Sequence, residues 1–148
     1  MKRYSIARIF RIFCLRAVTY FPMNGKFRAR FVKWGGVKMT DVFHSYIGEG
    51  VIFDSLYPEE IVIGKHVHIT MGCIILSHAL DTSVKGIRWK KSPVKIGDNC
   101  FIGAKTIICN SVQIGNNVII GAGSVVTKNI PDNEIWAGNP ARFIKRRV

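Results

Sequence analysis

Aliphatic residues recur at every sixth position along two stretches of this chain. The series runs through Ile63, Ile69, Ile75, Ile96, Ile102, Ile108, Ile114, Ile120 and Val126, with one gap after Ile75. A small or β-branched residue follows four positions after each of them: Val67, Cys73, Ala79, Cys100, Thr106, Val112, Val118, Ser124 and Ile130. Neither a helix nor an alternating strand has a period of six. The pattern predicts an all-β chain, a left-handed parallel β-helix in which each hexapeptide forms one face of a three-sided coil.

The register of the repeat predicts where the coils begin and how they turn. Residues 63–80 supply one coil and residues 96–131 supply two, while Ile47 and Phe53 predict an irregular coil upstream that is interrupted around residues 55–60. Glycine follows the aliphatic residue directly at five positions: 64, 97, 103, 115 and 121. We expect these glycines to turn the corners with positive φ, a conformation that glycine adopts without steric cost.

The gap in the repeat, at about residues 81–93, predicts a loop extruded from the solenoid. It contains Trp89 among several basic residues, and His78 lies just before it. Such excursions leave the stacked coils intact and often carry function. His78 falls on an outward position of the repeat, and a titratable group at this junction is a candidate functional residue.

The charge of the chain is strongly basic and unevenly distributed. It has 22 Lys and Arg against 9 Asp and Glu, a net charge of +13, and no acidic residue precedes Asp41. We therefore divide the chain into a basic N-terminal segment, residues 1–40, and a β-helix domain, residues 41–148, with a basic C-terminal tail. Such a charge favours anionic partners: acidic lipid, phosphorylated small molecules or nucleic acid.

Residues 3–21 fit a short amphipathic helix, with an apolar side that includes Phe10 and Phe13 and with Arg8, Arg11 and Arg16 opposite. A helix of this kind predicts either binding to the surface of an anionic membrane or packing as a cap on the open end of the solenoid. The arginines interrupt the apolar stretch, which argues against a signal peptide and a membrane span. We expect a cytoplasmic protein, with the inner face of the membrane as a candidate peripheral site.

Two sequence segments resemble the hexapeptide acyltransferase family, and within it the maltose, galactoside and polysaccharide O-acetyltransferases. They are "SHALD" before the extruded loop and "IGAGSVVTKNIP" followed by "AGNPAR" near the C-terminus. The resemblance implies a homotrimer that binds acetyl-CoA in the groove between neighbouring subunits, with His78 as the catalytic base. Independently of the resemblance, a hydroxyl nucleophile needs a base to take its proton, and histidine is suited to that role near neutral pH.

The resemblance also implies which residues meet acetyl-CoA. They are Phe101, where relatives commonly carry tryptophan, the small residues Ala104 and Ala122, Thr127 and Lys128, and the basic residues Arg142 and Lys145. Weaker candidates for contact with the acceptor are Asp54, Glu59 and Trp89, because carboxylates suit sugar hydroxyls and an indole ring can stack on a sugar. Asp81 is a candidate for orienting His78, or else a turn residue that begins the loop.

No metal is expected. His66 and His68 form an HxH pair on outward positions, but no third ligand stands at a characteristic spacing, and the four cysteines lack the spacing of a zinc site or a disulfide framework. The histidine pattern of the carbonic anhydrases that share this fold is also missing.

Three classes of function remain open at the level of sequence. The leading one is acetyl-CoA-dependent O-acetylation of a sugar hydroxyl in a polysaccharide, glycolipid or precursor, by direct transfer without an acyl-enzyme. Acetylation of serine or of a xenobiotic is the sister alternative. The short N-terminal segment and the single glycine of the loop, Gly86, disfavour serine, and the small size of the loop disfavours a xenobiotic. The different class is a non-catalytic basic trimer that binds membrane or nucleic acid, and nucleic acid is disfavoured because basic and aromatic residues do not alternate along one groove.

Overall fold

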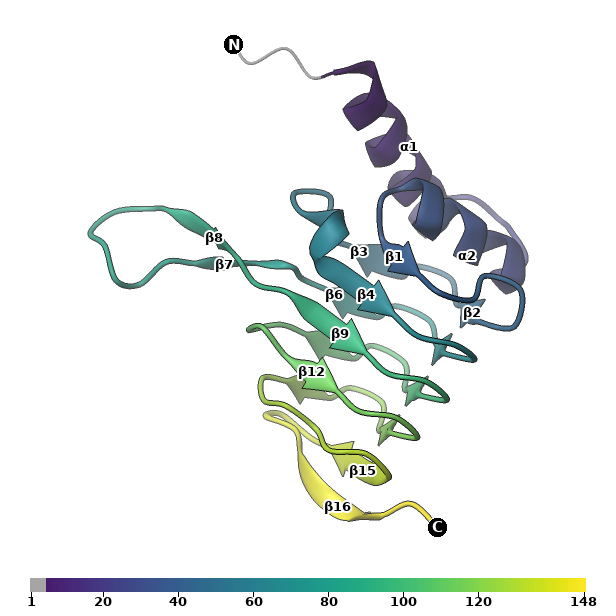
Figure 1. Ribbon diagram of the computed structural model, residues 1–148, viewed down its shortest axis with the longest axis vertical. Coiled ribbons are helices and arrows are strands. Elements are labelled where there is room, and N and C mark those ends of the chain that lie inside the picture. The colour runs from purple at the N-terminus through teal and green to yellow at the C-terminus, as the bar shows by residue number, and fades with distance from the viewer. Residues whose placement is uncertain (1–4) are drawn as a thin grey trace.

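The hexapeptides form short strands that stack into three parallel sheets in a computed structural model, which describes residues 5–148 (Figure 1). Sheet A contains β1 (Lys38–Met39), β4 (Ile61–Ile63), β9 (Val94–Ile96) and β12 (Gln113–Ile114). Sheet B contains β2 (Tyr46–Ile47), β5 (His68–Ile69), β10 (Phe101–Ile102) and β13 (Ile119–Ile120). Sheet C contains β3 (Ile52–Phe53), β6 (Ile74–Ile75), β11 (Ile107–Ile108) and β14 (Val125–Val126). Each coil gives one strand to each sheet, so these residues form four stacked coils.

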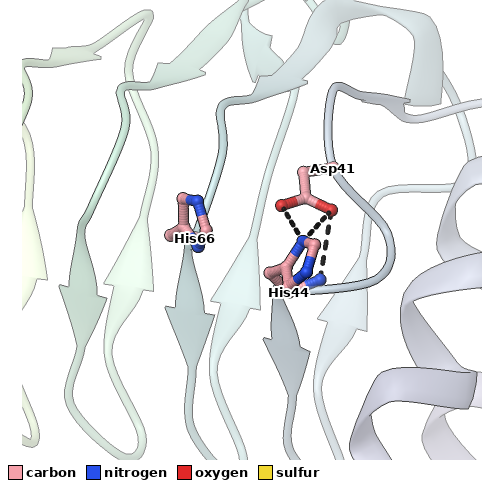
Figure 2. A group of neighbouring side chains, drawn as sticks. All are labelled: Asp41, His44 and His66. Carbon is pink, nitrogen blue, oxygen red and sulfur yellow. Dashed lines mark hydrogen bonds and ion pairs between the residues drawn. The ribbon is translucent and has the colours of Figure 1, made fainter.

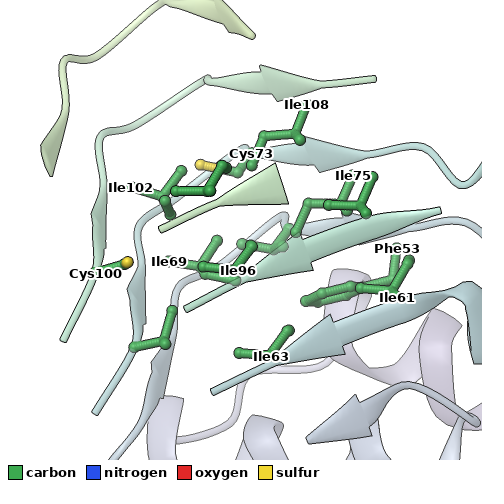
Figure 3. Close-up of a cluster of buried hydrophobic side chains, with 14 of the residues drawn as sticks. Phe53, Ile61, Ile63, Ile69, Cys73, Ile75, Ile96, Cys100, Ile102 and Ile108 are labelled. Atoms are coloured by element: carbon green, nitrogen blue, oxygen red, sulfur yellow. The ribbon is translucent and has the colours of Figure 1, made fainter. Parts of the chain in front are cut away.

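The core of the solenoid is built from the predicted inward positions (Figure 3). All nine aliphatic residues of the series are buried, each with at most 2% of its surface exposed. Equivalent residues of successive coils pair directly, as Ile69 does with Ile102 and Ile102 with Ile120. Burying one such side chain stabilises the fold by about 1.5–3 kcal/mol. Ile47 and Phe53 are buried as well, which confirms the irregular first coil.

One predicted inward position is wrong. Ala79 is only half-buried, and it lies in β7 (His78–Leu80), a strand that has already left the solenoid. Ser77 is the last fully buried residue of the second coil. The reason is that β7 pairs antiparallel with β8 (Trp89–Lys91), so the extruded loop is a β-hairpin whose ladder begins at His78.

The predicted reason for the repeated glycines is also wrong. None of the five glycines that follow an aliphatic residue has a positive φ. A Cβ on Gly97 would instead lie 2.5 Å from the carbonyl oxygen of Gly115 in the next coil. Positive φ occurs two residues later, at His66, Asn99 and Asn117. Glycine is therefore required because the coils approach closely, and the left-handed turn falls to asparagine, which tolerates it better than most residues.

Two helices close the N-terminal end of the solenoid, where one was predicted. They are α1 (Ile6–Tyr20) and α2 (Gly25–Trp34), and Ser5 and Asn24 cap them by accepting hydrogen bonds from backbone amides of the first turn. Leu15 and Val18 of α1 and Val32 of α2 are buried in the same apolar core as the first coil. A solenoid needs such a cap because its last coil would otherwise expose its apolar interior. The first strand begins at Lys38, within the predicted N-terminal segment.

The opposite end is closed by a hairpin of β15 (Glu134–Ala137) and β16 (Arg142–Arg146), which extends sheet B (Figure 1). The turn between the two strands lies over the last coil, since the amide of Ala141 donates a hydrogen bond to the carbonyl of Val125 (2.8 Å). The remaining element, the 3-10 helix η1 (Pro58–Glu60), interrupts the chain between the first two coils. It confirms the predicted insertion.

Candidate active site

His78 and Asp54 come together at the corner between sheets C and A, although 24 residues separate them in the chain. Asp54 follows the last strand of the first coil, and His78 follows the last strand of the second. The two strands pair in parallel, with Phe53 opposite Ile75, so both chains leave the solenoid side by side. The Nδ1 atom of His78 lies 2.5 Å from Oδ2 of Asp54, a short hydrogen bond.

The Asp54 carboxylate is buried, with 5% of the residue exposed, and its oxygens are occupied within the chain. The amides of Leu56 and Ser77 each donate a hydrogen bond to it at 2.8 Å, in addition to the His78 ring. Burial disfavours the charged form, but these hydrogen bonds outweigh it and hold the pKa of Asp54 below its ordinary value. The expectation that Asp54 would contact an acceptor hydroxyl is therefore corrected: its place is behind the imidazole.

This arrangement determines what the His78 ring can do. A carboxylate accepts hydrogen bonds and cannot donate them, so its contact with Nδ1 favours the tautomer that carries the proton there. The Nε2 atom is then left with its lone pair, which can accept a proton from a substrate. The side chain of His78 is 27% exposed, so the ring remains accessible. The pair has the geometry of a general base and its orienting carboxylate.

The hairpin forms one wall of this site. The Trp89 ring meets the His78 ring edge-on at a centroid distance of 5.1 Å, and 53% of Trp89 is exposed. Lys91, which is paired with His78 across the hairpin, binds Glu60 at 2.6 Å and lies 3.9 Å from Glu59. Glu59, a weak candidate for acceptor contact, thus helps to tie the hairpin to the insertion.

Asp81 acts as the turn residue of the hairpin. Its Oδ1 atom accepts hydrogen bonds from the hydroxyl (2.6 Å) and the amide (3.2 Å) of Ser83, which lower the pKa of its carboxyl. Its other oxygen lies 3.5 Å from Arg88. Of the two expectations for Asp81, the turn is the one that these contacts support, and Asp54 orients His78 instead.

The candidate acetyl-CoA residues lie on the last two coils and the C-terminal hairpin. Ala104 and Ala122 stack at the corner between sheets B and C, where the amide of Gly123 donates to the carbonyl of Ala104 (2.7 Å). Phe101 points outward from sheet B, 42% exposed. Thr127 and Lys128 directly follow β14, the last strand of sheet C, at the end opposite Ala122.

Arg142 and Lys145 belong to the exposed strand β16. Arg142 begins that strand directly after the turn that covers the last coil. The fold thus brings Ala104 and Ala122 together, and it leaves the other candidates spread along the outside of the last two coils and the C-terminal hairpin.

Comparisons with known proteins agree with this fold. Residues 93–128 match the family model described as "Hexapeptide repeat of succinyl-transferase". A solved maltose O-acetyltransferase from Clostridium difficile 630 superposes with a TM-score of 0.68 at 27% identity, over 98% of this chain and 90% of that one. The chain resembles the hexapeptide-repeat acyltransferases in both sequence and fold. It therefore has the left-handed β-helix predicted from the repeat.

Other proteins resemble part of the chain. Protein CapG of Staphylococcus aureus is 53% identical over 95 residues, which are 60% of this chain and 54% of CapG. The candidate colanic acid biosynthesis acetyltransferase WcaF of Escherichia coli is 30% identical over 111 residues, 75% of this chain and 60% of WcaF. The chain thus spans little more than half the length of these relatives. A galactoside acetyltransferase solved in complex with coenzyme A shares the fold, with a TM-score of 0.65 at 24% identity, over 95% of this chain and 80% of that one.

A second polar cluster lies on the corner between sheets A and B (Figure 2). Asp41 and His44 of the first coil meet His66 of the second, with candidate ligand atoms all within 4.8 Å of one another. Sequence reasoning paired His66 with His68, whereas His68 lies beside Tyr46. Asp41 accepts hydrogen bonds from the amides of Phe43 (2.9 Å) and His44 (3.1 Å), and the His44 ring lies 3.0 Å from the same carboxylate. These contacts explain the cluster as a capped turn, and we assign no ion to it.

Sequence reasoning missed the part that Asp54 plays in the site, which is its hydrogen bond with His78. The signal that could have found it is its position, because it directly follows the buried Phe53 in the same register as the residue after Ile75. Two chain interruptions at the same corner of adjacent coils place their first residues next to each other.

Proposed function

We propose that the protein is an acetyl-CoA-dependent O-acetyltransferase whose acceptor is a hydroxyl group of a sugar, in a polysaccharide, a glycolipid or one of their precursors. The observation that carries the proposal is the His78–Asp54 pair at the base of an extruded hairpin, in which the carboxylate is buried and the imidazole stays partly exposed, in a fold shared with acyltransferases. The WcaF, maltose and galactoside relatives support a sugar as the acceptor class. The exposed face of Trp89 beside His78 offers a surface on which a sugar ring can stack.

In this mechanism Nε2 of His78 takes the proton of the acceptor hydroxyl as its oxygen attacks the thioester carbonyl of acetyl-CoA. The new C–O bond forms, the C–S bond breaks, and the proton on Nε2 passes to the departing thiolate. Asp54 remains ionised throughout, stabilises the transient imidazolium and keeps the ring in the productive orientation. The acetyl group moves directly from sulfur to oxygen, so the reaction requires no acyl-enzyme.

The donor site in this proposal lies along the last two coils. Ala104 and Ala122 are small enough for a pantetheine arm to approach their backbone, and Phe101 offers an apolar wall. Thr127, Lys128, Arg142 and Lys145 would meet the nucleotide end, where Arg142 suits a phosphate because guanidinium can bind it with two parallel hydrogen bonds. We also propose a homotrimer, because Phe101 and Ala122 are exposed within one subunit and a neighbouring subunit would supply the other side of the donor site.

The test is a calorimetric titration of acetyl-CoA into the purified protein, with Lys128→Ala and Arg142→Ala beside it. We expect each substitution to weaken binding by about five- to tenfold, since each removes one charge–phosphate contact worth about 1 kcal/mol. Lys33→Ala, which removes a charge from α2 at the other end of the molecule, is the matched control and should bind as the wild type does. An absence of binding by the folded protein would overturn the donor assignment.

A thiol-release assay with acetyl-CoA then tests the acceptor class. Mono- and oligosaccharides are supplied in parallel with serine at the same concentration. Turnover with sugars and not with serine is expected. Turnover with serine alone would mean that the acceptor is serine and not a sugar, and it would leave the proposed acetyl-CoA site unchanged.

A further inference from the structure

Helix α1 carries an exposed apolar face. Ile6 is 87% exposed, Ile9 57%, Phe10 53% and Phe13 59%. Their spacing of three and four residues places them on one side of the helix. Two phenylalanines and two isoleucines in one exposed row are more than the single apolar residues that protein surfaces commonly carry.

The same helix is firmly packed in its second half. Cys14, Leu15, Ala17 and Val18 are at most 6% exposed, and Thr19 donates a hydrogen bond (3.0 Å) to the carbonyl of Val51 in the first coil. The first half of α1 extends beyond the solenoid (Figure 1). The second half of α1 therefore caps the solenoid, as one of the two expectations for the N-terminal segment had it, and the first half presents an exposed apolar surface.

Charge determines which kind of partner fits this surface. Arg8, Arg11 and Arg16 are exposed on α1, and α2 adds the exposed Lys26, Arg30 and Lys33. The chain has no acidic residue before Asp41, so neither helix contains a carboxylate side chain. An exposed apolar row with basic neighbours matches the interface of an anionic lipid bilayer, where acyl chains take up the apolar side chains and lipid phosphates attract the basic ones.

We propose that α1 docks the protein on an anionic membrane surface, with Ile6, Ile9, Phe10 and Phe13 inserted at the level of the headgroups. Neither of the two helices that the structure describes is long and apolar enough to cross a membrane, so the contact is peripheral. Tyr20 and Phe21, 71% and 61% exposed at the end of α1, suit the same interfacial depth.

Docking in this way would bring the candidate active site close to the lipid. A cleft of about 500 Å³ lies between α1 and the insertion, lined by Arg8 and Arg11 on one side and by Tyr57 and Glu59 on the other. The carbonyl of Tyr57 accepts a hydrogen bond from the hydroxyl of Ser77, the residue before His78 (2.7 Å). An acceptor carried by a membrane lipid would thus arrive on the side of the molecule that holds the insertion and His78. The docking itself does not depend on the proposed function.

The first arm of the test is flotation of the full chain with vesicles of phosphatidylcholine containing about one third phosphatidylglycerol, an anionic lipid. The wild type should float with these vesicles. The variant Phe10→Ser/Phe13→Ser should bind at least about tenfold more weakly, since it removes two inserted rings. Phe143→Ser/Ile144→Ser is the matched control, because these residues are 50% and 56% exposed on β16 at the far end of the solenoid, and it should float as the wild type does.

The second arm tests charge. Binding should fall about tenfold or more in vesicles of phosphatidylcholine alone, and it should fall as salt is added. Arg11→Gln/Arg16→Gln should reproduce much of that loss, and Lys95→Gln/Arg146→Gln, which removes the same charge elsewhere, should not. Equal losses in the two charge variants would mean that net charge alone attracts the lipid, which would overturn the role assigned to α1.

Other copies of the chain are the competing occupant of this face. Light scattering of the wild type and of Phe10→Ser/Phe13→Ser separates the two explanations. An unchanged oligomer together with lost vesicle binding supports the proposal. If the wild type does not bind anionic vesicles and the oligomer dissociates in the variant, the apolar row is a contact between subunits, and the proposal is overturned.

Discussion

Two corners of the same prism differ sharply in regularity. At the corner between sheets A and B the second, third and fourth coils turn in the same way, and their polar side chains form a ladder. Asp98 accepts a hydrogen bond from the amide of Lys65 (2.7 Å), Asn116 from that of Asp98 (2.8 Å), and Asp132 from that of Asn116 (2.7 Å). This corner is a repeated structural device.

The corner between sheets C and A is regular only in the last two coils. The first coil is interrupted there by residues 54–60, and the second by the hairpin that begins at His78. The two interruptions lie next to each other because their coils are stacked, and the His78–Asp54 hydrogen bond joins them. The difference teaches that stacking makes adjacent coils turn alike where the connection between two sheets is short. The candidate catalytic pair lies where two adjacent coils both depart from that turn. The following predictions test this contrast, from the largest expected effect to the smallest.

The first prediction concerns the irregular corner. His78→Gln should lower kcat of acetyl transfer about 10³-fold, because removal of a general base typically costs a factor of 10² to 10⁴. Its thermal unfolding temperature should change little, since the side chain is not part of the core. Steady-state kinetics measure kcat, and calorimetry measures the unfolding temperature. Near-normal turnover by His78→Gln would remove the base from the mechanism.

The regular corner should respond in the opposite way. Gly97→Ala places a Cβ about 2.5 Å from the Gly115 carbonyl oxygen, so adjacent coils must separate, and we expect a loss of about 3 kcal/mol in the free energy of unfolding. Gly123→Ala is the control: it has a positive φ of 70° but no atom within 4 Å of the added Cβ, and should lose only about 1 kcal/mol. Similar losses in both would show that conformation, not coil spacing, selects these glycines.

Asp54→Asn tests the residue that joins the two interruptions. The amide cannot stabilise an imidazolium as a carboxylate does, so kcat should fall about 10²-fold, comparable to the loss of an orienting partner elsewhere. Asp54→Glu should recover part of the rate, which a purely structural role would not explain. A kcat like that of the wild type would contradict the positioning role.

The pH dependence of stability tests the same carboxyl. Its pKa is lower in the folded protein than in the unfolded chain, so Asp54 stabilises the fold above its ordinary pKa, and this contribution is lost as the pH falls through the folded value. The difference in unfolding free energy between the wild type and Asp54→Asn should therefore be constant near neutrality and shrink below about pH 4. Urea denaturation across that range measures it, and a difference that grows in acid would contradict the assignment.

The smallest effect is expected at Asn117, at the same corner as the ladder. Asn117 has a φ of 56° and donates a hydrogen bond to Oδ1 of Asn133 (3.0 Å). Asn117→Ala should cost about 1 kcal/mol of unfolding free energy, and Asn117→Gly less, because glycine accepts that backbone conformation. Urea denaturation resolves the order of the two variants. If alanine were the less costly replacement, backbone strain would not explain the asparagine.

The period of six determined most of this protein by itself. All nine aliphatic residues of the series from Ile63 to Val126 could be named as buried in advance, because coils that stack in register place these side chains in the interior. The place of the extruded hairpin and of His78 followed from where that period fails. The motifs around them were enough to indicate the family.

The tertiary structure decided what depends on contacts between coils. The pairing of Asp54 with His78, the close approach that requires glycine at position 97 and the division of α1 into a packed and an exposed half all join residues that are distant in the sequence, or surfaces whose neighbours the sequence does not name. A repeat specifies which residues face inward within a coil, but only the stacking specifies which residue of the next coil each one meets.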